Sequence, residues 1–112
     1  MAEYLAELYS PKPNWLALEP QERMAFFEEV GRGMAALTAL NVEPLALGEV
    51  DAQLAHAPSQ RFFALWKCPD RAALEALVAG IAASGWHEYF ETVNAAGTGT
   101  DLNGHLAQLA RI

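Results

Sequence analysis

A run of aromatic and ionisable residues in the last third of the chain carries the side chains best suited to chemistry. Trp86, His87, Glu88, Tyr89 and Phe90 follow one another. A histidine that titrates near neutral pH, beside a tyrosine and a carboxylate, could act as a general base on an acidic phenol or enol. In the alternative interpretation, Trp86 and Phe90 anchor a strand and leave His87 exposed. His87 is therefore a candidate catalytic residue and Tyr89 a candidate ligand-binding residue.

A second candidate catalytic residue, Asn94, follows shortly after. Its side-chain amide could hold an oxyanion. An asparagine that precedes Ala-Ala-Gly is often a turn residue instead, so both interpretations stay open.

Alternation along the expected strands predicts a cavity. Successive strand residues point to opposite faces, so every second residue shares a face. Three such groups are Tyr4, Ala6 and Leu8; Ala46, Gly48 and Val50; and Phe62, Ala64 and Trp66. Small residues at mid-strand, rimmed by aromatic ones, predict a cavity lined by Tyr4, Phe62 and Trp66. Alternatively, the small residues let the helices approach closely, which would also explain Gly31 and Gly33.

Charged residues interrupt the same strands. By alternation, Glu7, Glu49, Arg61 and Lys67 lie on the face away from the small residues. We expect ion pairs across or near a dimer interface, with catalysis as the alternative.

Metal or haem binding would need ligands that the sequence does not group together. The three histidines, His56, His87 and His105, match no compact ligand motif. Cys68, the one cysteine, can form neither an intrachain disulfide nor a zinc cluster. We therefore expect no cofactor and no metal, although a haem or metal ligand among the histidines stays open.

Hydrophobic periodicity predicts two strand–helix–strand units and a terminal helix. Strands are expected at 4–9, 42–50, 61–68 and 86–94, and 95–100 is expected to be a turn. Helices are expected to begin near Pro20, at Pro69-Asp70 and after Asp101, where proline and aspartate favour helix starts. This order predicts an α+β, ferredoxin-like βαββαβ fold in one domain, with a core at 3–97 and a C-terminal helix at 101–112. Both long helices would cover one face of a four-stranded antiparallel sheet.

Charge and composition exclude several classes of partner. The chain has 7 Lys+Arg against 14 Asp+Glu, a formal charge of −7, and its basic residues are scattered. Nucleic acid and anionic membrane surfaces need a basic patch, so neither is expected as a partner. Without a signal-peptide pattern or a long apolar run, the expected location is the cytoplasm. Hydrophobic residues make up 53% of the chain, which favours self-association.

From residue 3 to 97, the order and lengths of the elements resemble the dimeric α+β barrel superfamily. Arg61–Trp66 and Gly85–Asn94 are similar to segments of its small uncharacterised bacterial members. The superfamily includes antibiotic-biosynthesis-type monooxygenases and stress-responsive barrel proteins. The resemblance implies a homodimer with two sheets face to face, and a pocket between each sheet and its own helices. Members include cofactor-free oxygenases, isomerases, haem enzymes and proteins with no known activity.

Two functions fit these residues. In the first, a homodimer handles a small aromatic or polyketide-like compound, as a cofactor-independent oxygenase or isomerase. In the second, the chain is a non-catalytic, dimeric ligand-binding or interaction protein. The first predicts a cavity of roughly 300 Å³ or more with converging polar groups, and a purely structural dimer predicts a filled interior.

Overall fold

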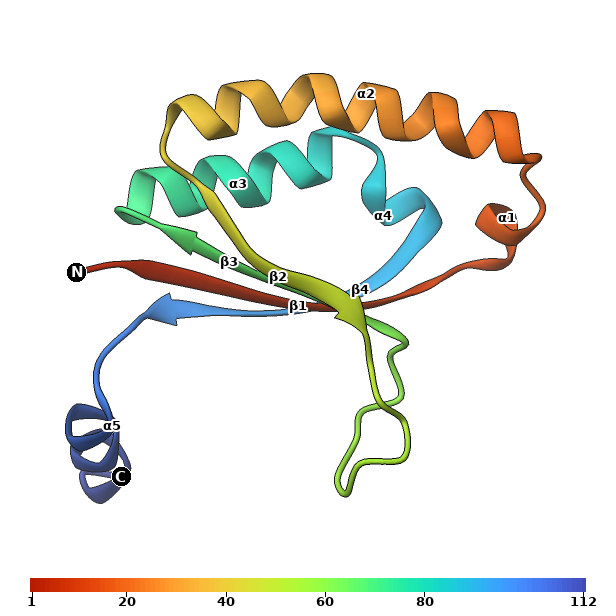
Figure 1. The fold of residues 1–112 in the computed structure, drawn as a ribbon. Coiled ribbons are helices and arrows are strands. Elements are labelled where there is room, and N and C mark those ends of the chain that lie inside the picture. Colours follow the sequence, from red (N-terminus) through yellow and green to blue (C-terminus); the bar gives the residue numbers. More distant parts are fainter.

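The computed structural model describes all residues from 1 to 112. Two strand–helix–strand units follow one another, as the sequence predicts (Figure 1). The elements are β1 (Glu3–Pro11), α1 (Pro13–Leu16), α2 (Pro20–Ala39), β2 (Glu43–Glu49), β3 (Phe62–Cys68), α3 (Arg71–Ala83), α4 (Trp86–Tyr89), β4 (Phe90–Thr98) and α5 (Leu102–Ala110). No helix combines the length and the apolar character that crossing a membrane requires.

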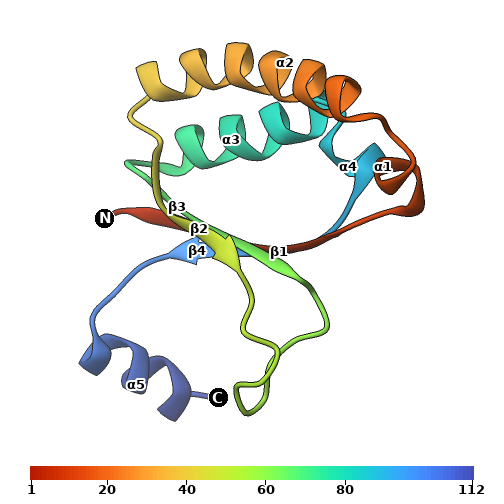
Figure 2. The ribbon, with the colours of Figure 1, turned by 45° about the vertical axis from the view of Figure 1, so that its right-hand side comes forward.

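The sheet has four antiparallel strands in the order β2-β3-β1-β4, which confirms the ferredoxin-like α+β fold. Helices α2 and α3 lie on one side of the sheet. Helix α5 and the loop between β2 and β3 lie on the other side (Figures 1 and 2). One sheet face is thus covered by helices, and the other carries only two protruding segments.

Local signals in the sequence fix where the three longer helices begin. At α2, the side chains of Glu19 and Glu22 form a reciprocal capping box around Pro20. At α3, the Ala73 N–H donates to Asp70 Oδ1 at 2.8 Å. At α5, the Gly104 N–H donates to Asp101 Oδ1 at 2.7 Å. Each aspartate cap contributes about 1 kcal/mol to helix stability.

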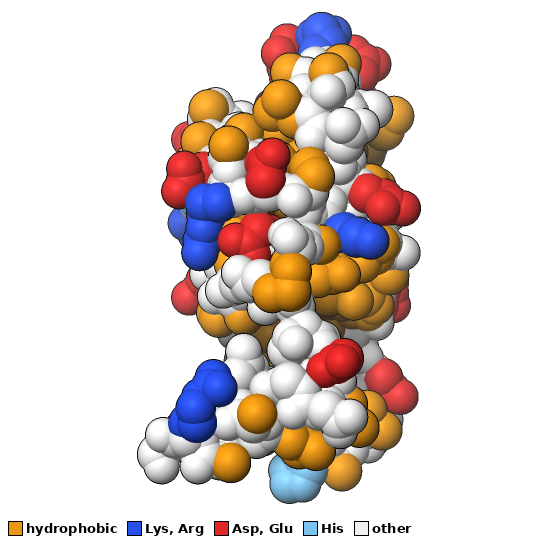
Figure 3. All heavy atoms as spheres, turned by 90° about the vertical axis from the view of Figure 1, so that its left-hand side faces the viewer, with side chains coloured by type: hydrophobic (Ala, Val, Ile, Leu, Met, Phe, Trp, Pro, Cys, Tyr) orange, Lys and Arg blue, Asp and Glu red, His pale blue; other side chains and the backbone are white.

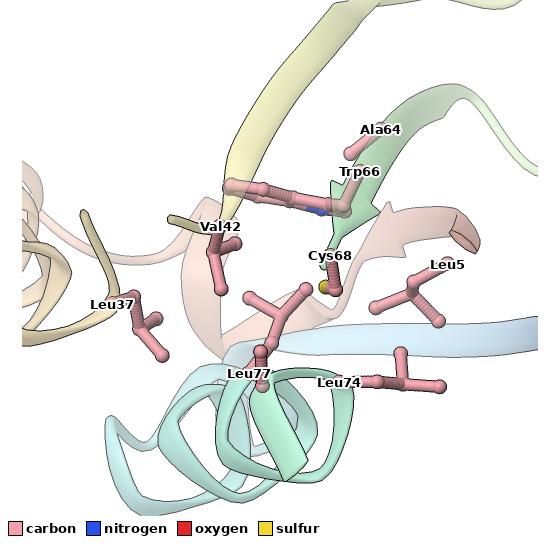
Figure 4. Packing of buried hydrophobic residues seen from close by; sticks show 9 residues of the cluster. Leu5, Leu37, Val42, Ala64, Trp66, Cys68, Leu74 and Leu77 are labelled. Carbon is pink, nitrogen blue, oxygen red and sulfur yellow. The ribbon is translucent and has the colours of Figure 1, made fainter. Parts of the chain in front are cut away.

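The core lies where α3 meets the centre of the sheet. Leu74 and Leu77 of α3 are directed at the strands, where Leu5 and Cys68 are buried (Figure 4). Trp66 lies on the same side of the sheet as these residues. In contrast, α2 buries only Leu37 among its twenty residues. Helix α2, the first of the two crossover helices, is therefore loosely packed against the rest of the chain.

The strand register decides which residues share a face. Directly opposite residues of an antiparallel pair point to the same side. On the side of α2 and α3, one row runs Leu47–Ala64–Glu7–Asn94, and its neighbours are Glu49–Phe62–Tyr9–Thr92 and Pro44–Trp66–Leu5–Ala96. On the other side, which we call the open face, the rows are Gly48–Phe63–Leu8–Val93, Ala46–Leu65–Ala6–Ala95 and Lys67–Tyr4–Gly97.

This register corrects the predicted grouping of residues. Tyr4 lies opposite Lys67, and Trp66 lies opposite Leu5. Tyr4 is therefore on the open face, whereas Trp66 and Phe62 are on the side of the helices. The expected cavity between all three residues cannot form, because the sheet itself separates Tyr4 from the other two.

The fourth strand also differs from the prediction. Residues 86–89 form the short helix α4, because Gly85 takes a left-handed φ of 85° and turns the chain there. Strand β4 then begins at Phe90 and continues to Thr98, so most of the expected turn at 95–100 is strand. Ala95 and Ala96 pair with Ala6 and Leu5 of β1, which extends the ladder past Asn94.

The open face is apolar and exposed. Tyr4, Leu65 and Val93 are 37%, 39% and 52% exposed on it. Helix α5 stands apart from the sheet, and its Leu102, Leu106 and Leu109 are 72%, 51% and 52% exposed. Figure 3 shows hydrophobic side chains at the surface of the molecule, both in its upper part and in the lower part, where α5 lies.

Candidate functional site

A cleft of about 870 Å³ lies between the sheet and the helices α2 and α3. Its walls are mainly apolar and come from six elements. The lining residues are Glu7 and Tyr9 (β1); Phe26, Glu29, Val30, Arg32, Gly33, Met34 and Leu37 (α2); Leu47 (β2); Ala64 and Trp66 (β3); Gly80, Ile81, Ala83 and the following Ser84 (α3); and Trp86 (α4). The volume lies within the range of small-molecule sites.

Small residues create this space. Ala64 lies between Leu47 and Glu7 in one row of the sheet, so only a methyl group projects from the middle of the cleft floor. On α2, a Cβ at Gly33 would meet no atom within 4 Å, and the same holds at Gly31. The alternative explanation, in which Gly31 and Gly33 permit close packing against the sheet, is therefore wrong. Gly33 faces the cleft, whereas Gly31 does not line it.

Glu7 is the one charged residue that the sheet presents to the cleft. Its side chain is only 3% exposed, and Trp66 Nε1–H donates to its Oε1 at 2.7 Å. Burial raises the pKa of Glu7, and the Trp66 hydrogen bond and the charge of His87 oppose that rise. The site thus holds a carboxyl group that gives up its proton less readily than an exposed one.

Tyr9 lies two residues further along β1, on the same face as Glu7. Its ring contacts Trp86 and Phe90 edge-on, with ring centroids 5.2 Å and 5.8 Å away. Burial raises the pKa of Tyr9, and the nearby charge of Glu7 raises it further. The phenol therefore stays neutral and keeps a proton to donate.

The predicted catalytic residues lie outside the cleft lining. His87 is exposed on α4, and its backbone carbonyl accepts a hydrogen bond from Lys12 Nζ at 2.7 Å. Asn94 is exposed on β4, directly opposite Glu7 in the register. Both residues thus lie on the Glu7 side of the molecule, but neither forms a wall of the cleft.

Of the four predicted ligand-binding residues, Trp66 lines the cleft. Tyr4 lies on the open face, where a Cβ at Gly99 would overlap its ring. Phe62 stacks on Tyr9, with ring centroids 6.0 Å apart, and lines a small hollow of about 180 Å³ beside the β2–β3 loop. Tyr89 packs on Trp15, with ring centroids 5.4 Å apart.

Within the chain, the expected ion pairs between strand residues do not form. Glu7 and Glu49 lie on the helix side of the sheet, and Lys67 lies on the open face, so the sheet separates their charges. The two salt bridges in the structure join Glu3 to Arg71, at 3.4 Å, and Glu29 to Arg32.

The histidines are far from forming a metal or haem site. None of His56, His87 and His105 lines the cleft, and His105 contacts Gln108 on α5 at 3.0 Å. No three His, Cys, Asp or Glu side chains are grouped as metal ligands. A haem in the cleft would find no histidine to bind its iron.

The sequence-based search missed Glu7 and Tyr9 as site residues. The sequence shows Glu7 as a charge in an apolar strand, but the predicted grouping places it on the wrong side of the sheet. The informative signal was a carboxylate two residues from a tyrosine in that strand, because residues at i and i+2 share a face.

Fold and site together define a ferredoxin-like α+β domain with an apolar cleft between the sheet and its helices. The chain belongs to a family of unknown function, DUF6616, which matches residues 2–112. No curated protein matches the chain in sequence.

Solved structures share the fold at low sequence identity. A mutant chlorite dismutase from Candidatus Nitrospira defluvii has a TM-score of 0.69 and 8% identity, over 89% of this chain and 40% of that one. A dimeric ferredoxin-like protein of unknown function from Thermobifida fusca has a TM-score of 0.53 and 15% identity, over 88% of this chain and 91% of that one. A dabb family protein with a ferredoxin-like fold from Mesorhizobium loti has a TM-score of 0.52 and 12% identity, over 89% and 98%.

These relatives confirm the resemblance to the dimeric α+β barrel superfamily at the level of the fold. The chain spans 45% and 40% of the two chains of chlorite dismutase type that it matches, which is less than half of each.

Proposed function

We propose that this protein is a homodimer that binds a small, planar, mainly apolar molecule in the cleft between its sheet and α2 and α3. The observation that carries the proposal is the cleft itself, whose volume is about 870 Å³ and whose floor holds one buried carboxyl group. A filled interior would have favoured a purely structural role.

The aromatic lining favours a planar ligand. Tyr9, Phe26, Trp66 and Trp86 all contribute to the walls. Aromatic rings prefer offset-stacked or edge-to-face contacts, which contribute about 0.5–1.5 kcal/mol beyond area burial. A flat ring system can make several such contacts at once, so an aromatic or polyketide-like compound fits this lining.

The open face supports the homodimer. An antiparallel sheet packed on helices on one side usually presents polar residues to water on the other. Here the central row is Ala46–Leu65–Ala6–Ala95, which is apolar throughout. Two such faces can pack about 10 Å apart. The Thermobifida fusca protein, which shares the fold and is dimeric, supports a homodimer.

Isomerisation by proton transfer fits the cleft better than oxygenation does. Glu7 is a buried carboxyl group without a cationic partner, and such a group suits proton transfer. Non-catalytic ligand binding is the second candidate, and the exposed positions of His87 and Asn94 favour it.

Filling the cleft tests the proposal. Gly33→Phe places a ring in the space that Gly33 leaves, and Gly31→Phe adds the same ring to the same helix outside the cleft lining. The probes are 2-naphthol, 2-tetralone and indole. Their binding is measured by calorimetry and by the fluorescence of Trp66 and Trp86. We expect at least one probe to bind the wild type and Gly31→Phe alike, and Gly33→Phe to weaken binding about tenfold or more, equivalent to 1.4 kcal/mol.

Two outcomes would contradict the proposal. If none of the probes binds, or if both phenylalanine variants bind as the wild type does, the cleft is not a ligand site. Native mass spectrometry of the untagged protein tests the dimer, and a monomer at micromolar concentration would overturn that part alone.

A further inference from the structure

We infer that Glu7 removes and returns a proton on an enolisable aromatic ketone held in the cleft, while the Tyr9 hydroxyl donates a hydrogen bond to the ketone oxygen. This inference rests on the proposed ligand-binding function of the cleft. It names the class of substrate and the two groups that act on it.

The surroundings of Glu7 leave one carboxyl oxygen for a ligand. Oε1 accepts the hydrogen bond from Trp66, whereas Oε2 has no hydrogen-bond partner and is not among the fully enclosed unpaired atoms. No Lys or Arg forms a salt bridge with Glu7. Burying an unpaired carboxylate costs free energy of folding. Glu7 forms no salt bridge that would offset this cost, so we infer that its position facing the cleft serves a function.

Tyr9 completes the arrangement. Its ring is held by Trp86 and Phe90, and the residue lines the cleft together with Glu7. Residues two apart on one strand lie about 7 Å apart along it, from a rise of about 3.3 Å per residue. One ketone can therefore present its α-carbon to Glu7 and its oxygen to Tyr9.

The step balances without a co-reactant. The Glu7 carboxylate takes a proton from the α-carbon, and the electron pair of that C–H bond forms the C=C bond of an enolate. The negative charge moves to the ketone oxygen, where the Tyr9 hydroxyl stabilises it. Glu7, now protonated, returns the proton to a conjugated carbon, which is isomerisation, or to the same carbon. When Glu7 first swaps its proton for one from water, the return to the same carbon is hydrogen exchange with solvent. Nothing is oxidised or reduced.

The charged groups around the cleft and the burial of Glu7 support its role as the base. Tyr9 on β1, His87 on α4, and the paired Glu29 and Arg32 on α2 are the titratable or charged groups near the cleft, and α3 contributes none to its lining. Burial raises the pKa of Glu7, which makes its carboxylate a stronger base.

Hydrogen exchange on a simple ketone tests the inference. The probe is 2-tetralone, whose acidic protons lie between an aromatic ring and a carbonyl. In D₂O, proton NMR follows the loss of the signal from those protons, and calorimetry measures binding separately. We expect the wild type to accelerate exchange. Glu7→Gln should bind the probe but reduce exchange by about a hundredfold or more, and Tyr9→Phe should reduce exchange by about a hundredfold to a thousandfold. Glu28→Gln, on the exposed surface of α2, should exchange as the wild type does.

The outcomes separate this inference from the proposed function. If 2-tetralone binds but the wild type gives no exchange above buffer, or if Glu7→Gln exchanges at the wild-type rate, Glu7 is not the base, and the cleft remains a ligand site. If no probe binds, the proposed function itself fails. Should Glu7→Gln not fold, Trp66→Phe keeps the carboxyl group, and the pH profile of exchange must move to higher pH. A profile that does not move would overturn the inference.

Discussion

Replacing Trp66 by phenylalanine isolates the hydrogen bond that holds Glu7. The variant removes the Nε1–H that donates to Glu7 Oε1 at 2.7 Å, and it keeps an aromatic ring at a position that is 8% exposed. That hydrogen bond favours the charged form of Glu7, so its loss raises the pKa of Glu7 further.

The size of the effect depends on the protonation state of Glu7. A hydrogen bond to a charged group contributes about 1.5–3 kcal/mol to stability, and a neutral one about 0.5–1.5 kcal/mol. Because burial already raises the folded pKa of Glu7, the protein is most stable where Glu7 is protonated, and this stability is lost as the pH rises through the folded pKa. Trp66→Phe should therefore destabilise the fold more at about pH 8 than at about pH 4.5, by roughly 1–2 kcal/mol.

Denaturant unfolding at the two pH values measures this difference. Trp86→Phe is the matched control, because Trp86 also lines the cleft but its Nε1 has no hydrogen-bond partner. Both variants lose ring volume, and only Trp66→Phe should show the added loss at high pH. An equal loss at both pH values, or the same pH dependence in Trp86→Phe, would refute the role given to this hydrogen bond.

Two further predictions concern the open face. Leu65→Lys places a charge in the central row of the open face, so it should raise the dimer dissociation constant about tenfold or more in sedimentation experiments. The control, Met24→Lys on the exposed surface of α2, should leave the dissociation constant unchanged. Equal dissociation constants for the two variants would argue against this interface. Gly99→Ala should cost about 1 kcal/mol of stability, because the new Cβ would overlap the Tyr4 ring. Adding Tyr4→Ala to the same chain removes that ring, so most of the cost should disappear. Additive effects of the two changes would exclude this contact as the cause.

The fold was largely predictable because its signals are local. Proline and acidic residues at Pro20, and aspartate caps at Asp70 and Asp101, mark the starts of the helices, and each is seen in the structure. The start of β4 was not predictable in the same way. Trp86–Tyr89 reads as strand by composition, but the left-handed turn at Gly85 makes it a short helix. Pairing with β1 then extends β4 through residues that read as a turn.

The site was less predictable, for a physical reason. Alternation tells which residues of one strand share a face, but it does not tell which face of one strand matches that of the next. That match depends on the register, which only the folded sheet sets. Counting Tyr4 with Trp66 therefore placed Glu7 on the wrong side, and the residue on the cleft floor was interpreted as an interface charge. Within one strand, alternation is sufficient: Ala64 and Trp66 share a face, as the sequence predicts.

Helix α5 has a consequence for how the chain orders itself. It contains nine residues, and isolated helices shorter than about 12–15 residues are marginal in water. Its Asp101 cap contributes only about 1 kcal/mol, and its leucines stabilise nothing while they remain exposed. A surface that covered Leu102, Leu106 and Leu109 would also supply free energy that keeps α5 helical. Folding of this segment would then be coupled to that binding, and the helix content of the last residues would rise on association.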